Sequence, residues 1–204
     1  MRQEEKTELT KAKILGAAME EFGINGYANG SINNICKKGI NKGLIYHNYK
    51  DKDELYMICV KKSCERMIDF MDQENAESSM DQYMNARMRF FKENTSEAHI
   101  FFEALLDPSQ HLKVQIREAM KDFEALNVRM YEKTISGLTL RENVSKEDAL
   151  RYFSLFQEMF NGYFCSPAFQ TMDFEEKIQI HESTIPRILN FMLYGIAERR
   201  DTNS

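Results

Sequence analysis

Lysine and tyrosine side chains are concentrated between residues 37 and 56 of a chain whose net charge is −5. Five lysines fall within residues 37–52, where Asp51 is the one acid, and three tyrosines lie in or just after this stretch. Ammonium and phenol groups both bind phosphate oxygens. Gly39, which favours a turn, stands in front of the aromatic segment. The pattern therefore favours contact with a polyanion over a role in solubility alone.

The charge is divided between the two ends of the chain. Residues 1–62 contain 11 Lys and Arg against 8 Asp and Glu, whereas residues 63–204 contain 16 against 24. The first part is therefore basic and the second acidic. A small basic end on an acidic body predicts that the polyanion contact is confined to the basic end.

Helical spacing of apolar residues recurs throughout the chain, and no segment reads convincingly as a β-strand. A first helix is predicted over residues 7–22, with Gly23 ending it. Ser31 is a suitable N-cap for a short second helix over residues 32–38, which Gly39 ends. The glycine-containing turn then leads into another short helix.

This third helix is predicted over residues 41–48, anchored in the core by Ile40, Ile45 and Tyr49. Asp51 is expected to cap a fourth helix over residues 52–71. Five further helices are predicted over residues 79–92, 96–107, 109–137, 146–165 and 173–198, with Ser96 capping the second of these, Ser145 and Asp148 capping the fourth, and Pro186 kinking or breaking the last.

Two short helices joined by a glycine-containing turn, and braced by a preceding helix, form a helix-turn-helix unit. A helix of about two turns fits a DNA major groove roughly 12 Å wide. Helix N-termini present free N–H groups to phosphates. Together with the lysines and tyrosines around it, the unit predicts binding to double-stranded DNA.

The segment from the first helix to the start of the fourth resembles the TetR family of bacterial transcription regulators. The matching motifs, in chain order, are ILGAAMEEFG, GY, SINNICKK, KGLIYHNY and KDEL. The sequence departs from the family pattern at Cys36, Leu44 and Tyr49, and it is one residue shorter just before Gly39. Because the third helix keeps its core spacing, we expect the missing residue to be lost from the turn.

The resemblance implies an all-α fold with a helix-turn-helix DNA-binding domain over residues 1–51, a connecting helix over 52–71, and a larger effector-binding and dimerisation domain over 72–204. It also implies phosphate binding by Tyr46 and Lys52. The residues expected to contact DNA are Ser31, Asn41, Lys42, Gly43, Leu44, Tyr46, His47, Asn48 and Lys52. Taken alone, Tyr46 could instead be a half-buried aromatic and Lys52 a solvated lysine, and His47 could equally be an ordinary surface histidine.

The predicted helices over residues 146–165 and 173–198 are apolar on two sides rather than one. A surface helix needs one apolar stripe, so a second stripe predicts another partner. A twofold homodimer with a four-helix interface would cover both, and would place two recognition helices about 34–36 Å apart on a palindromic operator. The expected interface residues are Phe153, Phe160, Tyr163, Ile188, Met192 and Ile196.

Between the helix-turn-helix and the expected dimer helices, aromatic and methionine residues form either a plain core or, as the resemblance implies, a pocket for a small-molecule effector. Thirteen methionines favour an adaptable interior and an apolar or aromatic ligand. The candidate pocket residues are Phe90, Phe101, Phe102, Met120, Phe123, Met130, Phe156 and Met159.

Other functional classes find little support in the sequence. Four cysteines without CxxC spacing and four scattered histidines give no metal pattern, so we expect buried thiols in a cytoplasmic protein with no cofactor. No apolar run approaches the ~20 residues of a membrane span, so no membrane partner is expected. With no nucleophile elbow, phosphate loop or paired catalytic carboxylates, an enzyme is not expected. The main hypothesis is a ligand-responsive repressor, and the alternative is a helical scaffold with a degenerate helix-turn-helix.

Overall fold

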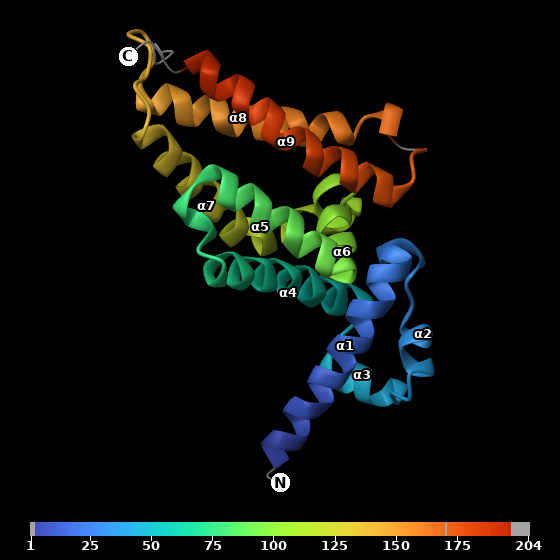
Figure 1. Ribbon diagram of the computed structural model, residues 1–204. Coiled ribbons are helices and arrows are strands. Elements are labelled where there is room, and N and C mark those ends of the chain that lie inside the picture. Colours follow the sequence, from blue (N-terminus) through green and yellow to red (C-terminus); the bar gives the residue numbers. More distant parts are fainter. Residues whose placement is uncertain (1–2, 170, 197–204) are drawn as a thin grey trace. The chain divides into compact units, whose positions relative to one another are not determined.

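The computed structural model describes residues 3–169 and 171–196. Over these residues the chain contains nine α-helices, three short 3-10 helices and no β-strand, which confirms the predicted all-α class (Figure 1). The chain packs as two compact units. The first unit contains residues up to Ile68 together with Phe90–Asp122, and the second contains Asp69–Arg89 and the residues from Phe123 onward. The functional boundaries at residues 51 and 71 remain a prediction.

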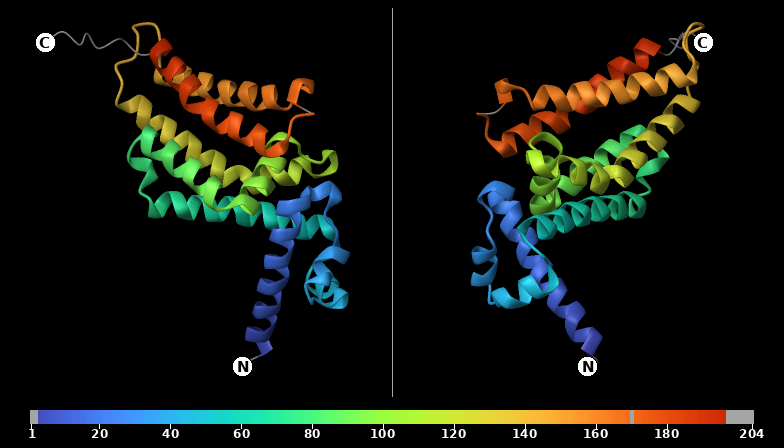
Figure 2. Two further views of the ribbon diagram at one scale, coloured as in Figure 1. Left: turned by 45° about the vertical axis from the view of Figure 1, so that its right-hand side comes forward. Right: turned by 180° about the vertical axis from the view of Figure 1, so that it is seen from behind.

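The first unit holds the helix-turn-helix. Its helices are α1 (Gln3–Asn29), α2 (Ile32–Lys37), α3 (Lys42–Asn48), most of α4 (Lys52–Gln73), α6 (Thr95–Leu106), the 3-10 helix η2 (Gln110–Leu112) and the start of α7 (Lys113–Ser136). Helices α2 and α3 contact each other and α1, as Figure 2 shows, and α6 packs against α1. The short helices are therefore braced by the long α1.

Helix α1 does not end at Gly23, which corrects the prediction. The non-helical backbone lies three residues later, at Gly26, whose φ is 66° and ψ −179°. Gly23 is needed for another reason, since a Cβ there would lie 2.5 Å from the Cβ of Ser96 in α6. Ser96 is accordingly a packing residue rather than the predicted N-cap, and α6 begins after Asn94 without a side-chain cap bond.

The turn between α2 and α3 follows the prediction closely. Ser31 caps α2, because its hydroxyl accepts a hydrogen bond from the Asn34 N–H at 3.1 Å. Gly39 has φ 77°, a left-handed conformation that favours glycine. Ile40 and Ile45 are both buried, at 6% and 0% exposure. The short turn therefore leaves the core register of α3 intact.

The second unit is built from longer helices. It contains η1 (Ala76–Ser78), most of α5 (Met80–Glu93), the rest of α7, α8 (Lys146–Phe164), η3 (Pro167–Phe169) and α9 (Phe174–Ile196). The capping box at the start of α8 is confirmed, with Ser145 and Asp148 each bonding the other's backbone N–H. Pro186 does not break α9, which continues as one helix to Ile196.

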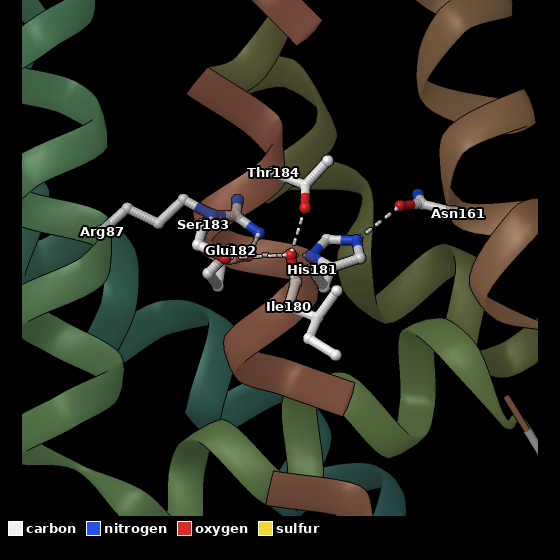
Figure 3. Close-up of polar contacts among 7 residues, drawn as sticks. All are labelled: Arg87, Asn161, Ile180, His181, Glu182, Ser183 and Thr184. Carbon is white, nitrogen blue, oxygen red and sulfur yellow. Dashed lines mark hydrogen bonds and ion pairs between the residues drawn. The ribbon is translucent and has the colours of Figure 1, made fainter. Parts of the chain in front are cut away.

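A buried polar network joins three helices of the second unit (Figure 3). Arg87 of α5 donates to both carboxylate oxygens of Glu182 of α9, at 2.6 and 2.8 Å, and both side chains are 6% exposed. His181 Nδ1 lies 3.0 Å from Glu182 Oε1, and its Nε2 lies 3.1 Å from the amide of Asn161 in α8. The partner atoms, Glu182 Oε1 and Asn161 Oδ1, are both acceptors, and a neutral imidazole has one N–H, so it donates to one of them at a time.

Acidification is expected to weaken this network in two stages. Burial lowers the pKa of His181 below 6.5. The contribution of the neutral His181 to the stability of the fold is therefore complete above pH 6.5 and is lost as the pH falls below 6.5. Burial alone would raise the pKa of Glu182, but Arg87 and His181 reverse this and lower it from 4.5 to about 2. The Glu182 contribution, roughly 3 kcal/mol, is present above pH 4.5 and is lost as the pH falls through about 2.

Chemical unfolding of the wild type and of His181→Gln at about pH 8, 6 and 4 measures the first stage. The substitution should remove much of the loss between about pH 6 and 4, whereas His111→Gln, at an exposed histidine, should leave it. An identical pH profile for His181→Gln and the wild type would contradict the assignment of this stage to His181.

Candidate nucleic-acid interface

Helix α3 turns its polar and aromatic side chains outward. The Asn41 side-chain oxygen accepts a hydrogen bond from the Gly43 N–H at 2.7 Å and so caps the first turn. Ile45 is 0% exposed and anchors the inner face, whereas Leu44 is 45% and Tyr46 49% exposed. A helix held at one end and along one face in this way presents a fixed outer surface.

The nine predicted DNA-contact residues fall into two groups. The exposed ones are Asn41, Lys42, Gly43, Leu44, Tyr46 and His47, and the half-buried ones are Ser31, Asn48 and Lys52. Ser31 and Asn48 also stabilise the fold, since Ser31 caps α2 and the Asn48 amide donates to the Leu44 carbonyl at 2.7 Å. DNA contact by these residues remains a prediction.

Lysines on α2 and α3 form hydrogen bonds and an ion pair at the surface. Lys42 donates to the Asn33 side-chain oxygen at 3.0 Å, and Lys37 donates to that of Asn34 at 3.0 Å. Lys38 pairs with Glu20 at 2.6 Å, with the glutamate side chain 60% exposed. Exposed pairs of this kind contribute little free energy, so a phosphate can compete for these ammonium groups.

Glu21 supports this surface, and the sequence analysis missed it. One of its carboxylate oxygens accepts from the Ser31 N–H at 3.0 Å and from the Asn34 amide at 2.8 Å, while the residue is 5% exposed. It thereby ties the N-terminus of α2 to α1. The sequence offers no signal for this role, because Glu20 and Glu21 are adjacent glutamates. Only the fold shows that Glu21 is buried while Glu20 is mostly exposed.

Glu103 of α6 holds the break in α1. Its carboxylate accepts from the Tyr27 N–H at 2.8 and 2.9 Å and from the Tyr56 hydroxyl of α4 at 2.9 Å. Burial raises the pKa of Glu103, although these two hydrogen bonds oppose the shift. Burial, followed by the Glu103 charge, raises the pKa of Tyr56, so its phenol stays protonated and donates. Three helices of the first unit thus meet at one carboxylate.

The predicted dimer residues are divided between interior and surface. Phe153 and Phe160 are 5% and 7% exposed, with Phe153 stacked on Tyr131 and Phe160 in contact with His181. Tyr163 is 60% exposed, Ile188 and Met192 are half-buried, and the Ile196 side chain lies outside the described residues. The apolar residues that α8 leaves exposed are Tyr152, Leu155, Met159 and Tyr163.

The candidate pocket residues also differ in exposure. Six of them are at most 4% exposed, namely Phe90, Phe101, Phe102, Met120, Phe123 and Met130. Phe156 is half-buried and Met159 is 65% exposed. Their role in binding an effector remains a prediction.

The four cysteines differ in exposure. Cys59 and Cys64 are buried, Cys36 is half-buried and Cys165 is exposed. The prediction that all four thiols are buried was therefore wrong.

Membrane spans and metal clusters are both absent from the described residues. None of their helices is both long and apolar enough to cross a membrane. Nor do residues 3–169 and 171–196 bring together three or more His, Cys, Asp or Glu side chains that could hold a metal ion.

A helix-turn-helix whose second short helix faces outward, with lysines at residues 37, 38, 42, 50 and 52 in and around it, is typical of a DNA-binding protein class. Residues 14–57 match the family model described as bacterial regulatory proteins, tetR family. This match confirms the resemblance of the motifs in residues 14–57 to the TetR family. TetR-family regulators are DNA-binding transcription regulators, and residues 14–57 of this chain are similar to their common segment.

The fold of the whole chain is also that of TetR-family structures. A TetR family transcriptional regulator from Chloroflexus aurantiacus J-10-FL is 18% identical, over 94% of this chain and 95% of that chain, with a TM-score of 0.57. The fatty acid degradation regulator FadR from Bacillus halodurans is 15% identical, over 91% and 98%, with a TM-score of 0.60. The TetR family regulator PfmR from Thermus thermophilus is 17% identical, over 92% and 96%, with a TM-score of 0.53. No curated protein matches the chain significantly.

Proposed function

We propose that the protein is a homodimeric transcription repressor that binds a palindromic operator and is released by a small apolar or aromatic effector. The observation that carries the DNA-binding part is the exposure of Tyr46, 49%, on a helix whose inner face is fixed by the fully buried Ile45. With Lys42 and Lys52 nearby in the sequence, Tyr46 can donate to a phosphate while the ammonium groups neutralise it. We propose no catalytic role and a cytoplasmic location.

The proposed dimer is supported by the apolar side chains that α8 and α9 leave uncovered. Four of them follow one face of α8, and Phe191 and Tyr194 of α9 are 78% and 61% exposed. Exposed apolar patches of this kind usually mark an interaction site. A second copy with the same two helices would cover them by twofold symmetry. This face, rather than Phe153 and Phe160, is the proposed contact.

The proposed effector response is supported by Glu103. Because its carboxylate joins α6 to α1 and α4, a shift of α6 would be transmitted to the helix-turn-helix. An effector that favours one position of α6 would change operator affinity by its differential binding to the two states. The exposure of Met159, 65%, favours a place on the dimer surface over the pocket.

DNA selected from a random-sequence pool by the wild-type protein provides the ligand for a direct test. Tyr46→Phe and Lys52→Met should each weaken binding about 10- to 100-fold, since each removes a phosphate contact from both subunits of the dimer. Lys62→Met is the matched control, because Lys62 is an exposed lysine of α4 paired with Glu65. Gel-shift titration measures all four proteins.

The selected DNA should contain an inverted repeat, and adding the effector should lower the affinity. Selection of no DNA by the wild-type protein would contradict the proposed function and favour the scaffold alternative. Equal affinities for the wild type, Tyr46→Phe and Lys52→Met would contradict the assignment of the phosphate contacts.

A further inference from the structure

Tyr27 lies immediately after the break in α1 and is held from several sides. Its N–H donates to Glu103, and its hydroxyl donates to Asp53 of α4 at 2.5 Å and lies 3.2 Å from His111 Nε2 of η2. Its ring packs against the Tyr56 ring with centroids 4.9 Å apart. The ring is therefore fixed in position by α4, α6 and η2 together.

The Lys52 ammonium sits on this ring, 4.4 Å from its centroid. This distance is within the range of a cation–π interaction. Among the described residues no carboxylate forms an ion pair with Lys52, although Asp53 and Glu103 both lie within its electrostatic influence. The aromatic face is thus the direct partner of the Lys52 ammonium in the free protein.

The Tyr27 ring remains an uncharged platform. Burial, together with the hydrogen bond to Asp53, raises the pKa of Tyr27 to about 12, so the phenol stays protonated around neutral pH. The bonds from Tyr27 and His111 in turn lower the pKa of Asp53, which keeps its carboxylate charged as an acceptor. An uncharged ring attracts the ammonium without neutralising it.

We propose that Tyr27 is a positioning residue for DNA binding, which holds the Lys52 ammonium over its ring face so that Lys52 meets a DNA phosphate already ordered. This inference rests on the proposed function. A free lysine side chain loses rotamer freedom on binding, and pre-ordering removes part of that cost. Because one face of the ammonium rests on the ring, its N–H groups on the other side remain available to phosphate oxygens.

The same contacts make Tyr27 a route of regulation. Glu103 fixes its backbone from α6, and His111 contacts its hydroxyl from η2. A displacement of either element would move the ring and, with it, the resting position of Lys52. The operator affinity would then change without any change in α3 itself.

The test is a double-mutant cycle on DNA selected by the wild-type protein. Tyr27→Leu removes the ring face and should weaken DNA binding about 5- to 20-fold, because each dimer has two helix-turn-helix units. Tyr27→Phe keeps the ring face and should weaken DNA binding much less. In a Lys52→Met background, Tyr27→Leu should have almost no further effect. In a Lys42→Met background, it should retain its full effect.

A general structural role for Tyr27 would give a different result. Tyr27→Leu would then weaken binding by the same factor in the Lys52→Met and Lys42→Met backgrounds, which would overturn the proposal. A second readout needs neither DNA nor a variant that folds poorly. In NMR spectra of the wild-type protein, the Lys52 side-chain protons should be shifted upfield by the ring current, and ordinary lysine shifts would also overturn it.

Failure of the Tyr27 proposal and failure of the proposed function give different experimental results. A wild-type protein that binds no DNA contradicts the proposed function, and with it the role of Tyr27 in DNA binding. A wild-type protein that binds DNA, but shows no coupling between Tyr27 and Lys52, contradicts the role of Tyr27 alone.

Discussion

Replacing Arg87 by Met is expected to lower the free energy of unfolding by about 3–5 kcal/mol, because it leaves the buried Glu182 carboxylate without its main partner. Both side chains are 6% exposed and are joined by two hydrogen bonds, so neither charge can recover its hydration in place. Denaturation by urea, followed by circular dichroism, measures the change. The effect should be among the largest of any single side chain in the second unit.

The double variant Arg87→Met/Glu182→Leu is the informative control. Replacing both charges by apolar groups of similar size should restore most of the lost stability, since the cost comes from the unpaired charge rather than from the absence of the pair. Glu65→Ala, which removes a surface partner of Lys62, should change stability by less than about 1 kcal/mol. A loss in the double variant as large as in Arg87→Met would contradict this account.

Replacing Met159 by Glu is expected to separate the dimer. Met159 is 65% exposed in the middle of the apolar face of α8, and twofold symmetry would bring two such carboxylates into the interface. Burying an unpaired charge costs several kcal/mol, so the dissociation constant of the dimer should rise at least about 100-fold. Sedimentation velocity measures the change in oligomeric state.

Val114→Glu is the matched control for this substitution, because Val114 is an apolar residue of α7 that is 81% exposed and lies outside the proposed interface. It should leave the dimer intact. The Met159→Glu protein should also bind selected DNA much more weakly, since each helix-turn-helix unit then binds without its partner. A dimer that withstands Met159→Glu would place the interface elsewhere.

The helices of the helix-turn-helix segment could be predicted because local signals agree with each other there. Ser31 and Asn41 are good N-caps, Gly39 adopts a left-handed turn, and Ile40 and Ile45 keep the core spacing of α3. Each of these features acts within a few residues, so it can be read from the order of side chains alone.

The errors arose where a distant segment decides the local structure. Gly23 was predicted to end α1, but its role is to let Ser96 of α6 approach, a contact between residues far apart in the chain. Of the two outcomes predicted for Pro186, a break is excluded because α9 continues through it, and a kink stays a prediction. On α8, periodicity identified two apolar stripes but could not tell which one faces the subunit interior.

The candidate site shows the same division. Tyr46 and the lysines around it could be found from residue type and order. Glu21, Glu103 and the contact of Tyr27 with Lys52 could not, because each depends on which side chain of another helix lies opposite. The residues proposed to contact DNA are thus visible in the sequence, whereas those proposed to hold them in position are visible only in the fold.

The salt dependence of DNA binding by the wild-type protein tests most directly whether the helix-turn-helix binds DNA phosphates. A dimer that presents Tyr46, Lys42 and Lys52 to phosphates twice should lose affinity by about 10³-fold between roughly 50 and 200 mM salt, through release of counterions. The plot of log affinity against log salt should be steep, and Lys52→Met should reduce its slope by about two, one for each subunit. Affinity that hardly changes across this range, or a slope unaltered by Lys52→Met, would contradict the account.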